Sequence, residues 1–318
     1  MAGSERLWSL GTVLLVVVIL VAASAAGGYI YLKSRTVGSH PPLTVAFGDN
    51  VTVNYIGVFG SGPEQGKVFD TSEYAVATNP ALWPKGLEYT PRGAPANYTP
   101  LPVHIGPSTP SGGYSLGGLH FIQVVTGFWQ GMIGLPGNQT HTEVVPPALG
   151  YGATNPACVA TYPLVQYFPV VLTYPRSSFT QDYPGVLPQT GATFEQPHYQ
   201  WPVLILSTNA TSVTIENMAR VGQTADPSGW PVEVTNVSNA ENGTITVVNQ
   251  LTPADAGHLL GIDFAGTGPC QSQSNGKFIV TAVNPATGTY TADFNSEVTG
   301  ETLLFIVTVV DILPPTAP

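Results

Sequence analysis

The chain has 318 residues, of which 9% are charged and 43% are hydrophobic, and its formal net charge is -10. This length fits about two domains, and the hydrophobic content is sufficient for a core. The 35 glycines and 30 prolines disfavour a helical bundle. The acidic balance excludes a nucleic-acid-binding surface, which needs clustered Lys and Arg, because the six basic residues after Arg35 are scattered.

An uncharged apolar run extends from Leu7 to Leu32, between Arg6 on one side and Lys33 and Arg35 on the other. About 20 apolar residues are enough to span a bilayer as a helix. The run predicts a single-pass membrane anchor within residues 1–36, and a cleaved signal peptide is the alternative. Basic residues flank both sides, so the positive-inside rule does not decide the orientation.

Other features of the chain indicate an extracytoplasmic location and a glycoprotein. Six Asn-x-Ser/Thr sequons follow the apolar run, and each is a potential acceptor in a secreted chain. They begin at Asn50, Asn97, Asn138, Asn209, Asn236 and Asn242. Cys158 and Cys270 are the only cysteines, so a four-cysteine zinc site is excluded. The two cysteines either form one disulfide or remain separate buried thiols.

After the apolar run, short β-branched segments separated by turn clusters predict antiparallel sheet. A helical pattern occurs only around Phe121 to Ile133, and residues 74–113 show no period, as in a long loop or an insertion. Three candidate hairpins begin at Trp201, Trp230 and Lys277. They predict a small barrel or sheet and arise either by internal duplication or as unrelated hairpins with polar turns.

Two blocks, residues 47–72 and 114–156, carry an ordered set of motifs. These include Gly48-Asp49, Tyr55-x-Gly57, Phe69-Asp70-x-Ser72, Leu116-Gly117, Gly127-Phe128 and Pro146-Pro147 followed by Gly150-Tyr151-Gly152. This order resembles FKBP-type peptidyl-prolyl cis-trans isomerases. Residues 295–312 look like the final strand of the family's SlyD-like members, which carry an inserted domain in the flap.

The resemblance implies a mainly β (α+β) fold, with an FKBP-like antiparallel sheet wrapped on one short helix. Its expected parts are the anchor (1–36), the first part of the isomerase domain (44–164), an inserted all-β domain (165–294) and the final strand (295–313). It also implies an enzyme and chaperone that act on proline-containing unfolded or nascent polypeptides outside the cytoplasm, without cofactor or metal. The chain would be attached to the membrane by its N-terminal helix and would not bind nucleic acid.

The resemblance also assigns the site. Asp70, Tyr55 and Tyr151 would be the catalytic residues, with Asp70 the charged group at the edge of an aromatic pocket. The substrate-binding residues would be Phe69, Val124, Val125, Phe128 and Phe305, with Phe128 as the floor. Such a pocket suits a reaction without a nucleophile, since rotation about the X-Pro bond has a barrier of about 18–20 kcal/mol set by amide resonance.

Three departures or alternatives stay open in the sequence. Gly112 falls where relatives often place an aromatic pocket residue, and the stretch from Ser72 to Tyr114 is longer than the family norm. Read singly, Phe69 and Phe305 are ordinary core residues and Asp70 caps a turn. The alternative functions are therefore a catalytically inactive FKBP-like surface binding or structural protein, and a holdase chaperone.

Overall fold

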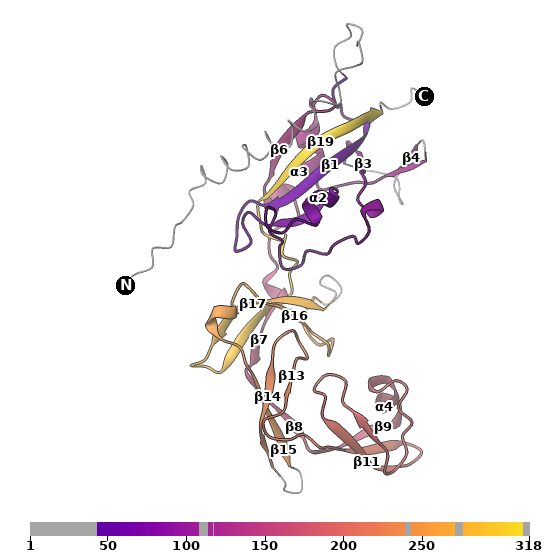
Figure 1. The fold of residues 1–318 in the computed structure, drawn as a ribbon, viewed down its shortest axis with the longest axis vertical. Helices are drawn as coiled ribbons and strands as arrows, with labels where there is room; N and C mark the ends of the chain where they lie inside the picture. Colours follow the sequence, from indigo (N-terminus) through magenta and orange to yellow (C-terminus); the bar gives the residue numbers. More distant parts are fainter. Residues whose placement is uncertain (1–42, 108–113, 117, 239–242, 271–275, 314–318) are drawn as a thin grey trace, which may run out of the picture. The chain divides into compact units, whose positions relative to one another are not determined.

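In the computed structural model, residues 43–107, 114–116, 118–238, 243–270 and 276–313 are described (Figure 1). The chain divides into two compact units, unit 1 (1–153 and 298–318) and unit 2 (154–297). The sequence placed the inserted domain at 165–294, within unit 2. The predicted anchor lies outside the described residues, and within the described ranges no helix has the length and apolar content needed to cross a membrane.

Unit 1 is built on an antiparallel sheet in which strands from both ends of the chain are neighbours. Its order is β2-β1-β19-β6, and β3 pairs with the first half of β1. The strands are β1 (Asn50–Phe59), β2 (Val68–Thr71), β3 (Leu101–His104), β6 (Thr140–Val145) and β19 (Leu303–Leu313). β1 and β19 pair along their whole length, from Asn50 with Leu313 to Phe59 with Leu303 (Figure 1).

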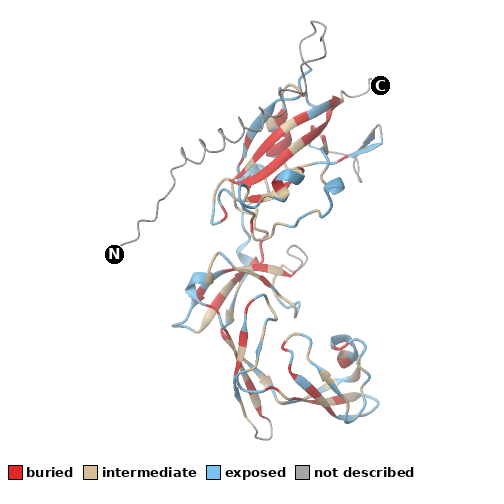
Figure 2. Ribbon diagram, in the orientation of Figure 1, coloured by how far each residue is buried: buried red, intermediate tan, exposed pale blue. Residues whose placement is uncertain are grey.

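Alternation along β1 divides its side chains between the two faces of the sheet. Val51, Val53 and Tyr55 belong to a core that includes buried side chains of the helix α3 (Thr126–Met132). Ile56 and Val58 belong to a second cluster. Both central strands are therefore buried along most of their length (Figure 2). The predicted helix around residues 121–133 is shorter than expected, because Phe121 belongs to strand β5 (Leu119–Phe121).

The segment after Ser72 is more ordered than the expected long loop. It contains α2 (Tyr74–Ala77), the 3-10 turn η1 (Pro95–Asn97) and β3. Val76, Trp83 and Tyr89 pack with Ile56 and Val58, so the segment covers the second face of the sheet with apolar side chains. A small hairpin of β4 (Tyr114–Leu116) and β5 follows. Gly112, named above as a departure, lies outside the described residues.

The described residues of unit 2 form three separate four-stranded antiparallel sheets, so the prediction of one small barrel or sheet is wrong. The predicted hairpins are present as β11-β12, β14-β15 and β17-β18. We call the sheets copy 1 (β10-β11-β12-β9), copy 2 (β13-β14-β15-β8) and copy 3 (β16-β17-β18-β7). In each sheet, one strand from the short segment 159–175 pairs with the hairpin. No strand was predicted from the sequence of this segment.

The strand bounds in unit 2 are as follows. Copy 1 has β9 (Val171–Pro175), β10 (Thr193–Glu195), β11 (Pro202–Thr208) and β12 (Ser212–Asn217). Copy 2 has β8 (Val165–Pro169), β13 (Thr224–Ala225), β14 (Val232–Val237) and β15 (Thr244–Asn249). Copy 3 has β7 (Val159–Pro163), β16 (Leu260–Ile262), β17 (Lys277–Asn284) and β18 (Thr289–Asp293). The remaining helical turns are η2 (Pro147–Leu149), η3 (Pro156–Cys158), α4 (Arg176–Asp182) and η4 (Pro253–Asp255).

The three copies share details that unrelated hairpins would not share. The first hairpin strand of each copy carries a register shift at the same place, after Ile205, Val234 and Val280. The backbone N–H groups of Gly191, Gly222 and Gly257 donate to the carbonyls of these same three residues. β7, β8 and β9 start six residues apart and each ends on proline. These shared irregularities favour internal duplication over chance similarity.

Copies 1 and 2 also share a buried indole–amide pair. Trp201 Nε1 donates to Asn217 Oδ1 at 3.0 Å, and Trp230 Nε1 donates to Asn249 Oδ1 at 2.8 Å. Trp230 then packs edge-on against Phe278 of copy 3, with ring centroids 5.8 Å apart. The indole of one copy therefore contributes to the core of the next.

The copies at the two ends of this series depart from the pattern. Copy 3 has Gly276 at the position where copies 1 and 2 have the tryptophan. It is cross-linked by the disulfide Cys158–Cys270 in place of the indole–amide pair. Copy 1 carries α4, whose Phe179 is fully buried against Tyr174 and Phe194. Terminal repeats in repeat proteins commonly carry such caps, because no neighbour covers them. Of the two states that the sequence left open for the cysteines, the structure therefore has the disulfide.

Candidate functional site

A cavity of about 620 Å³ lies in unit 1, and all eight residues named from the sequence line it. They are Tyr55, Phe69, Asp70, Val124, Val125, Phe128, Tyr151 and Phe305. They come from β1, β2, the loop before α3, α3 itself, the turn after η2, and β19. Four further residues also line the cavity and were not named from the sequence: Arg92, Leu101, Ile122 and Gln123.

Aromatic rings in edge-to-face contact form the inner wall of the cavity. The ring centroids of Phe128 and Phe305 are 4.7 Å apart, and those of Phe69 and Phe305 are 5.4 Å apart. The Tyr55 ring lies 5.9 Å from that of Phe128. Gly57 makes room for this wall, since a Cβ there would lie 2.4 Å from the Phe69 ring. The glycine of the Tyr-x-Gly motif is thus required by close packing.

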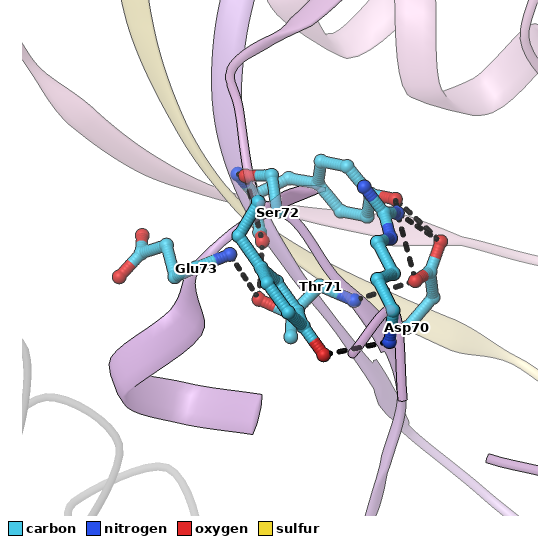
Figure 3. Close-up of polar contacts among 7 residues, drawn as sticks. Asp70, Thr71, Ser72 and Glu73 are labelled. Carbon is cyan, nitrogen blue, oxygen red and sulfur yellow. Dashed lines mark hydrogen bonds and ion pairs between the residues drawn. The ribbon is translucent and has the colours of Figure 1, made fainter. Parts of the chain in front are cut away.

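Three polar residues that line the cavity are hydrogen-bonded to one another in a triangle. Figure 3 shows the polar contacts around Asp70. Tyr55 Oη donates a hydrogen bond to Asp70 Oδ2. Arg92 Nη2 donates to Asp70 Oδ1 at 2.9 Å and to Tyr55 Oη at 2.6 Å. The Asp70 carboxylate therefore accepts from a neutral hydroxyl and from a guanidinium, and its side chain remains 44% exposed. The single charged group expected at the pocket edge is in fact an ion pair.

The turn after β2 fixes Asp70 relative to Tyr55. The Thr71 N–H donates to Asp70 Oδ1 at 2.8 Å, so the carboxylate also caps its own turn. Thr71 Oγ1 donates to the Tyr55 carbonyl at 2.9 Å, and Ser72 Oγ accepts from the Tyr55 N–H at 2.8 Å. Capping a turn and facing the cavity, which the sequence presented as alternatives for Asp70, occur together. The Glu73 carboxyl, next along the chain, points away from this cluster (Figure 3).

Arg92 reaches the cavity from the segment that follows Ser72, and its own loop holds it there. The Arg92 N–H donates to Tyr98 Oη at 2.8 Å, and Asn97 Nδ2 donates to the Arg92 carbonyl at 2.6 Å. The guanidinium carbon lies 5.9 Å from the Tyr55 ring centroid and 6.0 Å from that of Tyr98, within cation–π range. One signal in the sequence could have identified Arg92 as a site residue. Basic residues are rare in this chain, so an Arg close to aromatic residues is a candidate for a specific role.

Burial and charge keep the hydroxyls of the site protonated. The pKa of Tyr55 is raised well above its ordinary value, chiefly by burial and then by the charge of Asp70. The pKa of Tyr151 is raised by the same two causes in the same order. Burial lowers the pKa of Arg92, but Tyr55 and Asp70 together raise it further, and the net shift is upward. Around neutral pH both tyrosines are therefore hydrogen-bond donors and the guanidinium is charged.

Two donors at the rim have free capacity for a ligand carbonyl. Tyr151 is 50% exposed, in the Gly-Tyr-Gly turn whose Gly152 has a positive φ of 83°. The Val125 N–H donates to no described backbone carbonyl, although the Val125 carbonyl accepts from the first turn of α3. The exposed side chain of Ile122 extends the apolar wall to the surface. The arrangement suits a short apolar peptide segment held by its carbonyls.

Among the described residues, no group of three or more His, Cys, Asp or Glu side chains is placed to hold a metal ion. His120 is exposed, and His141 lies 3.3 Å from Glu143 Oε1 on β6. None of the described residues that line the cavity is Ser, Cys or His, so these residues offer binding and polarisation rather than covalent attack. In comparisons with known proteins, no family model and no curated protein matches this chain.

Proposed function

We propose that the chain is a peptidyl-prolyl cis-trans isomerase whose active site is the cavity of unit 1. The observation that carries the proposal is the convergence of eight residues, chosen from their order in the sequence, on one cavity. They are drawn from both sides of the 144-residue unit 2, so their proximity is not a consequence of nearness in the chain.

The geometry supports rotation about an amide bond without covalent catalysis. A prolyl ring in contact with Phe128, Phe69 and Phe305 would be held by apolar surface, as ligands generally are in concave sites. Rotation removes amide resonance, so the twisted nitrogen is pyramidal and the carbonyl is less dipolar than in the planar state. A wall of aromatic rings offers no hydrogen bond to the carbonyl of the planar state, so it disfavours this more dipolar state relative to the twisted state.

The polar groups would fix the peptide on either side of the rotating bond. Tyr151 Oη and the Val125 N–H can donate to substrate carbonyls, and Asp70, hydrogen-bonded to Tyr55, would face a substrate carbonyl at the edge of the cavity. Because Arg92 neutralises Asp70, the site has little net charge and suits uncharged segments of a polypeptide. The proposed substrates are proline-containing unfolded or nascent chains outside the cytoplasm, with the protein attached to the membrane by its N-terminal segment.

The direct test is an exchange measurement by NMR on a short X-Pro peptide, with no helper protease. The full chain is expected to raise the cis–trans exchange rate in proportion to its concentration. Tyr151→Phe should reduce this acceleration several-fold, because a donor worth about 1 kcal/mol is removed. The matched control is Tyr167→Phe, an exposed tyrosine of unit 2. An absence of acceleration by the folded wild-type chain would contradict the proposal.

A chaperone contribution from unit 2 is favoured by its exposed apolar side chains. Leu187 is 83% exposed, Tyr167 69% and Val221 64%. Such side chains can contact unfolded clients while the cavity isomerises their prolines. In an aggregation assay, suppression should survive a cavity mutation and be lost when residues 165–290 are removed. A catalytically inactive binding protein would instead bind proline peptides at the cavity without accelerating exchange.

A further inference from the structure

The hairpin tip of copy 1 presents an asparagine in a defined geometry. Asn209 is exposed between β11 and β12, and its Oδ1 accepts from the Thr211 N–H at 2.8 Å, Thr211 Oγ1 at 3.1 Å and the Ser212 N–H at 2.9 Å. This is an Asx turn, in which the side chain replaces a backbone acceptor. Nδ2 makes no hydrogen bond to a described residue.

We propose that Asn209 carries an N-linked glycan. The residues Asn209-Ala210-Thr211 form the acceptor sequence, and the Thr211 hydroxyl is already bound to the amide oxygen of the acceptor. The co-reactant is a sugar activated as a lipid-linked phosphate ester. A bond forms between Nδ2 and the anomeric carbon, the bond from that carbon to the phosphate oxygen breaks, the lipid phosphate leaves, and an Nδ2 proton passes to a base of the transferase.

Two other sequons differ from Asn209 in the burial of the asparagine or in the hydrogen bonds of its side-chain amide. Asn50 is 3% exposed, and its Oδ1 lies 2.9 Å from His104 Nδ1, so the folded sheet has no room for a sugar there. Asn97 is exposed, but its Nδ2 donates to the Arg92 carbonyl, so its reactive atom is already engaged. Burial therefore blocks the first position and an existing hydrogen bond occupies the second, whereas neither applies to Asn209.

The internal duplication supplies a matched control in the same chain. Thr208 pairs with Val213 in copy 1 and Val283 pairs with Tyr290 in copy 3, which makes Asn284 the equivalent of Asn209. Asn284 is also exposed, and its Oδ1 accepts from the N–H groups of Ala286 and Thr287. The turn is therefore of the same kind. Its sequence Asn284-Pro285-Ala286 has no hydroxyl at the third position and has proline at the second, so it is not an acceptor.

The experiment is peptide mass spectrometry on the full chain purified from its native membranes. The peptide with Asn209 is expected to carry a glycan mass, and those with Asn50 and Asn284 to be unmodified. An unmodified Asn209 peptide, or a glycan on Asn50, would overturn the inference. Thr211→Ala should abolish the modification at Asn209, while Thr211→Ser should retain it.

A gain-of-site variant tests the role of the turn. Pro285→Ala together with Ala286→Thr supplies the acceptor sequence on the existing Asn284 turn, and a glycan is expected at Asn284. A folded double variant that stays unmodified while Asn209 is modified would show that the Asx turn does not present the amide, and would overturn that part of the argument.

The inference rests on the extracytoplasmic location contained in the proposed function, but the two proposals fail separately. Asn209 lies in unit 2 and lines no part of the cavity, so Asn209→Gln should leave prolyl isomerisation unchanged. Isomerisation without a glycan would overturn the glycan site alone. A glycan on a chain that does not accelerate isomerisation would overturn the isomerase proposal alone.

Discussion

Replacing Asp70 by asparagine tests whether the ion pair at the cavity edge contributes to catalysis. The change keeps the shape of the side chain and removes its charge. Arg92 then lacks a counter-charge, and Tyr55 Oη donates to a weaker acceptor. Because the side chains of Asp70 and Arg92 are 44% and 30% exposed, solvent screens the pair. Its contribution to folding is therefore about 0.5–1 kcal/mol.

The expected effect on catalysis is larger than the effect on stability. A hydrogen bond to a charged group contributes about 1.5–3 kcal/mol, and partial exposure places this one near the lower limit. About 1.4 kcal/mol corresponds to a tenfold decrease in kcat/KM. The melting temperature should fall by only about 2–4 °C, as for a loss of about 1 kcal/mol in a domain of this size.

Glu73→Gln is the matched control, since it removes a carboxylate three residues away that does not line the cavity. Peptide exchange by NMR gives kcat/KM, and thermal unfolding gives the melting temperature. If Asp70→Asn keeps kcat/KM within twofold of wild type, the ion pair has no role in the reaction. If Glu73→Gln causes an equal loss, the effect is a general one of charge and the reasoning from the cavity fails.

Three further predictions concern other parts of the chain. Asn97→Ala removes the hydrogen bond that holds the Arg92 loop, which contributes about 1 kcal/mol. The value of kcat/KM should therefore fall by up to about fivefold, and the melting temperature by no more than about 2–4 °C. Cys158→Ser opens a disulfide that spans 112 residues and should lower the unfolding free energy of unit 2 by up to about 4–5 kcal/mol in calorimetry, leaving the transition of unit 1 in place. Burial raises the pKa of Glu143 above 4.5, so the folded state binds more protons and wild-type stability falls as pH rises through this range. Glu143→Gln should therefore melt higher than wild type at pH 7, and this difference should disappear as the pH falls below the ordinary carboxyl pKa of 4.5.

The eight residues that the resemblance assigned to the site line one cavity, and their motifs lie on strands and tight turns whose geometry is local. Phe69-Asp70-x-Ser72 ends a strand, and its side chains bond directly back to Tyr55 on the next strand. Alternation along a strand places Val51, Val53 and Tyr55 on one face, and the resemblance supplied the other cavity residues. The placement of the last strand beside the first required more, namely the resemblance of residues 295–312 to the end of a known fold.

Arg92 was missed because its position depends on a segment without periodicity. The described residues between Ser72 and Tyr114 contain one four-residue helix, one 3-10 turn and the strand β3. The first part of this segment is held by Trp83 and Tyr89, which pack on the second face of the sheet. No local pattern encodes that packing. The return of the segment to the cavity through Asn97 is likewise a tertiary effect.

The number of sheets in unit 2 was missed for a related reason. The hairpins were visible in the sequence, but each sheet is completed by one of three five-residue strands in segment 159–175. Those strands pair with residues 37 to 134 positions later in the chain, from Pro175 with Ser212 to Val159 with Asp293. Proline at the end of each strand suits an edge position, where a backbone N–H is not needed.

In each unit, hydrogen bonds join the residues beside the two points where the chain passes from one unit to the other, so unit 2 can be removed. In unit 1 the Gly300 N–H donates to the Gly152 carbonyl at 2.8 Å. In unit 2 the Asn155 N–H donates to Asn295 Oδ1 at 2.9 Å, and Asn295 Nδ2 donates to the Asn155 carbonyl at 3.1 Å. The insert therefore leaves and re-enters unit 1 at points that are already neighbours, so a short linker can replace it.

Replacing residues 154–297 by about six Gly and Ser residues should leave unit 1 folded and active on short peptides. Closing a 144-residue flexible loop costs about 3 kcal/mol more than closing a six-residue loop. The gain in stability on shortening the chain is smaller than this, because folded unit 2 already holds its own ends together. The shortened chain should therefore be no less stable than the full chain. Circular dichroism and peptide exchange measure both properties. A shortened chain that does not fold would show that unit 1 depends on unit 2. One that folds but does not accelerate exchange would place part of the active site outside the cavity described here.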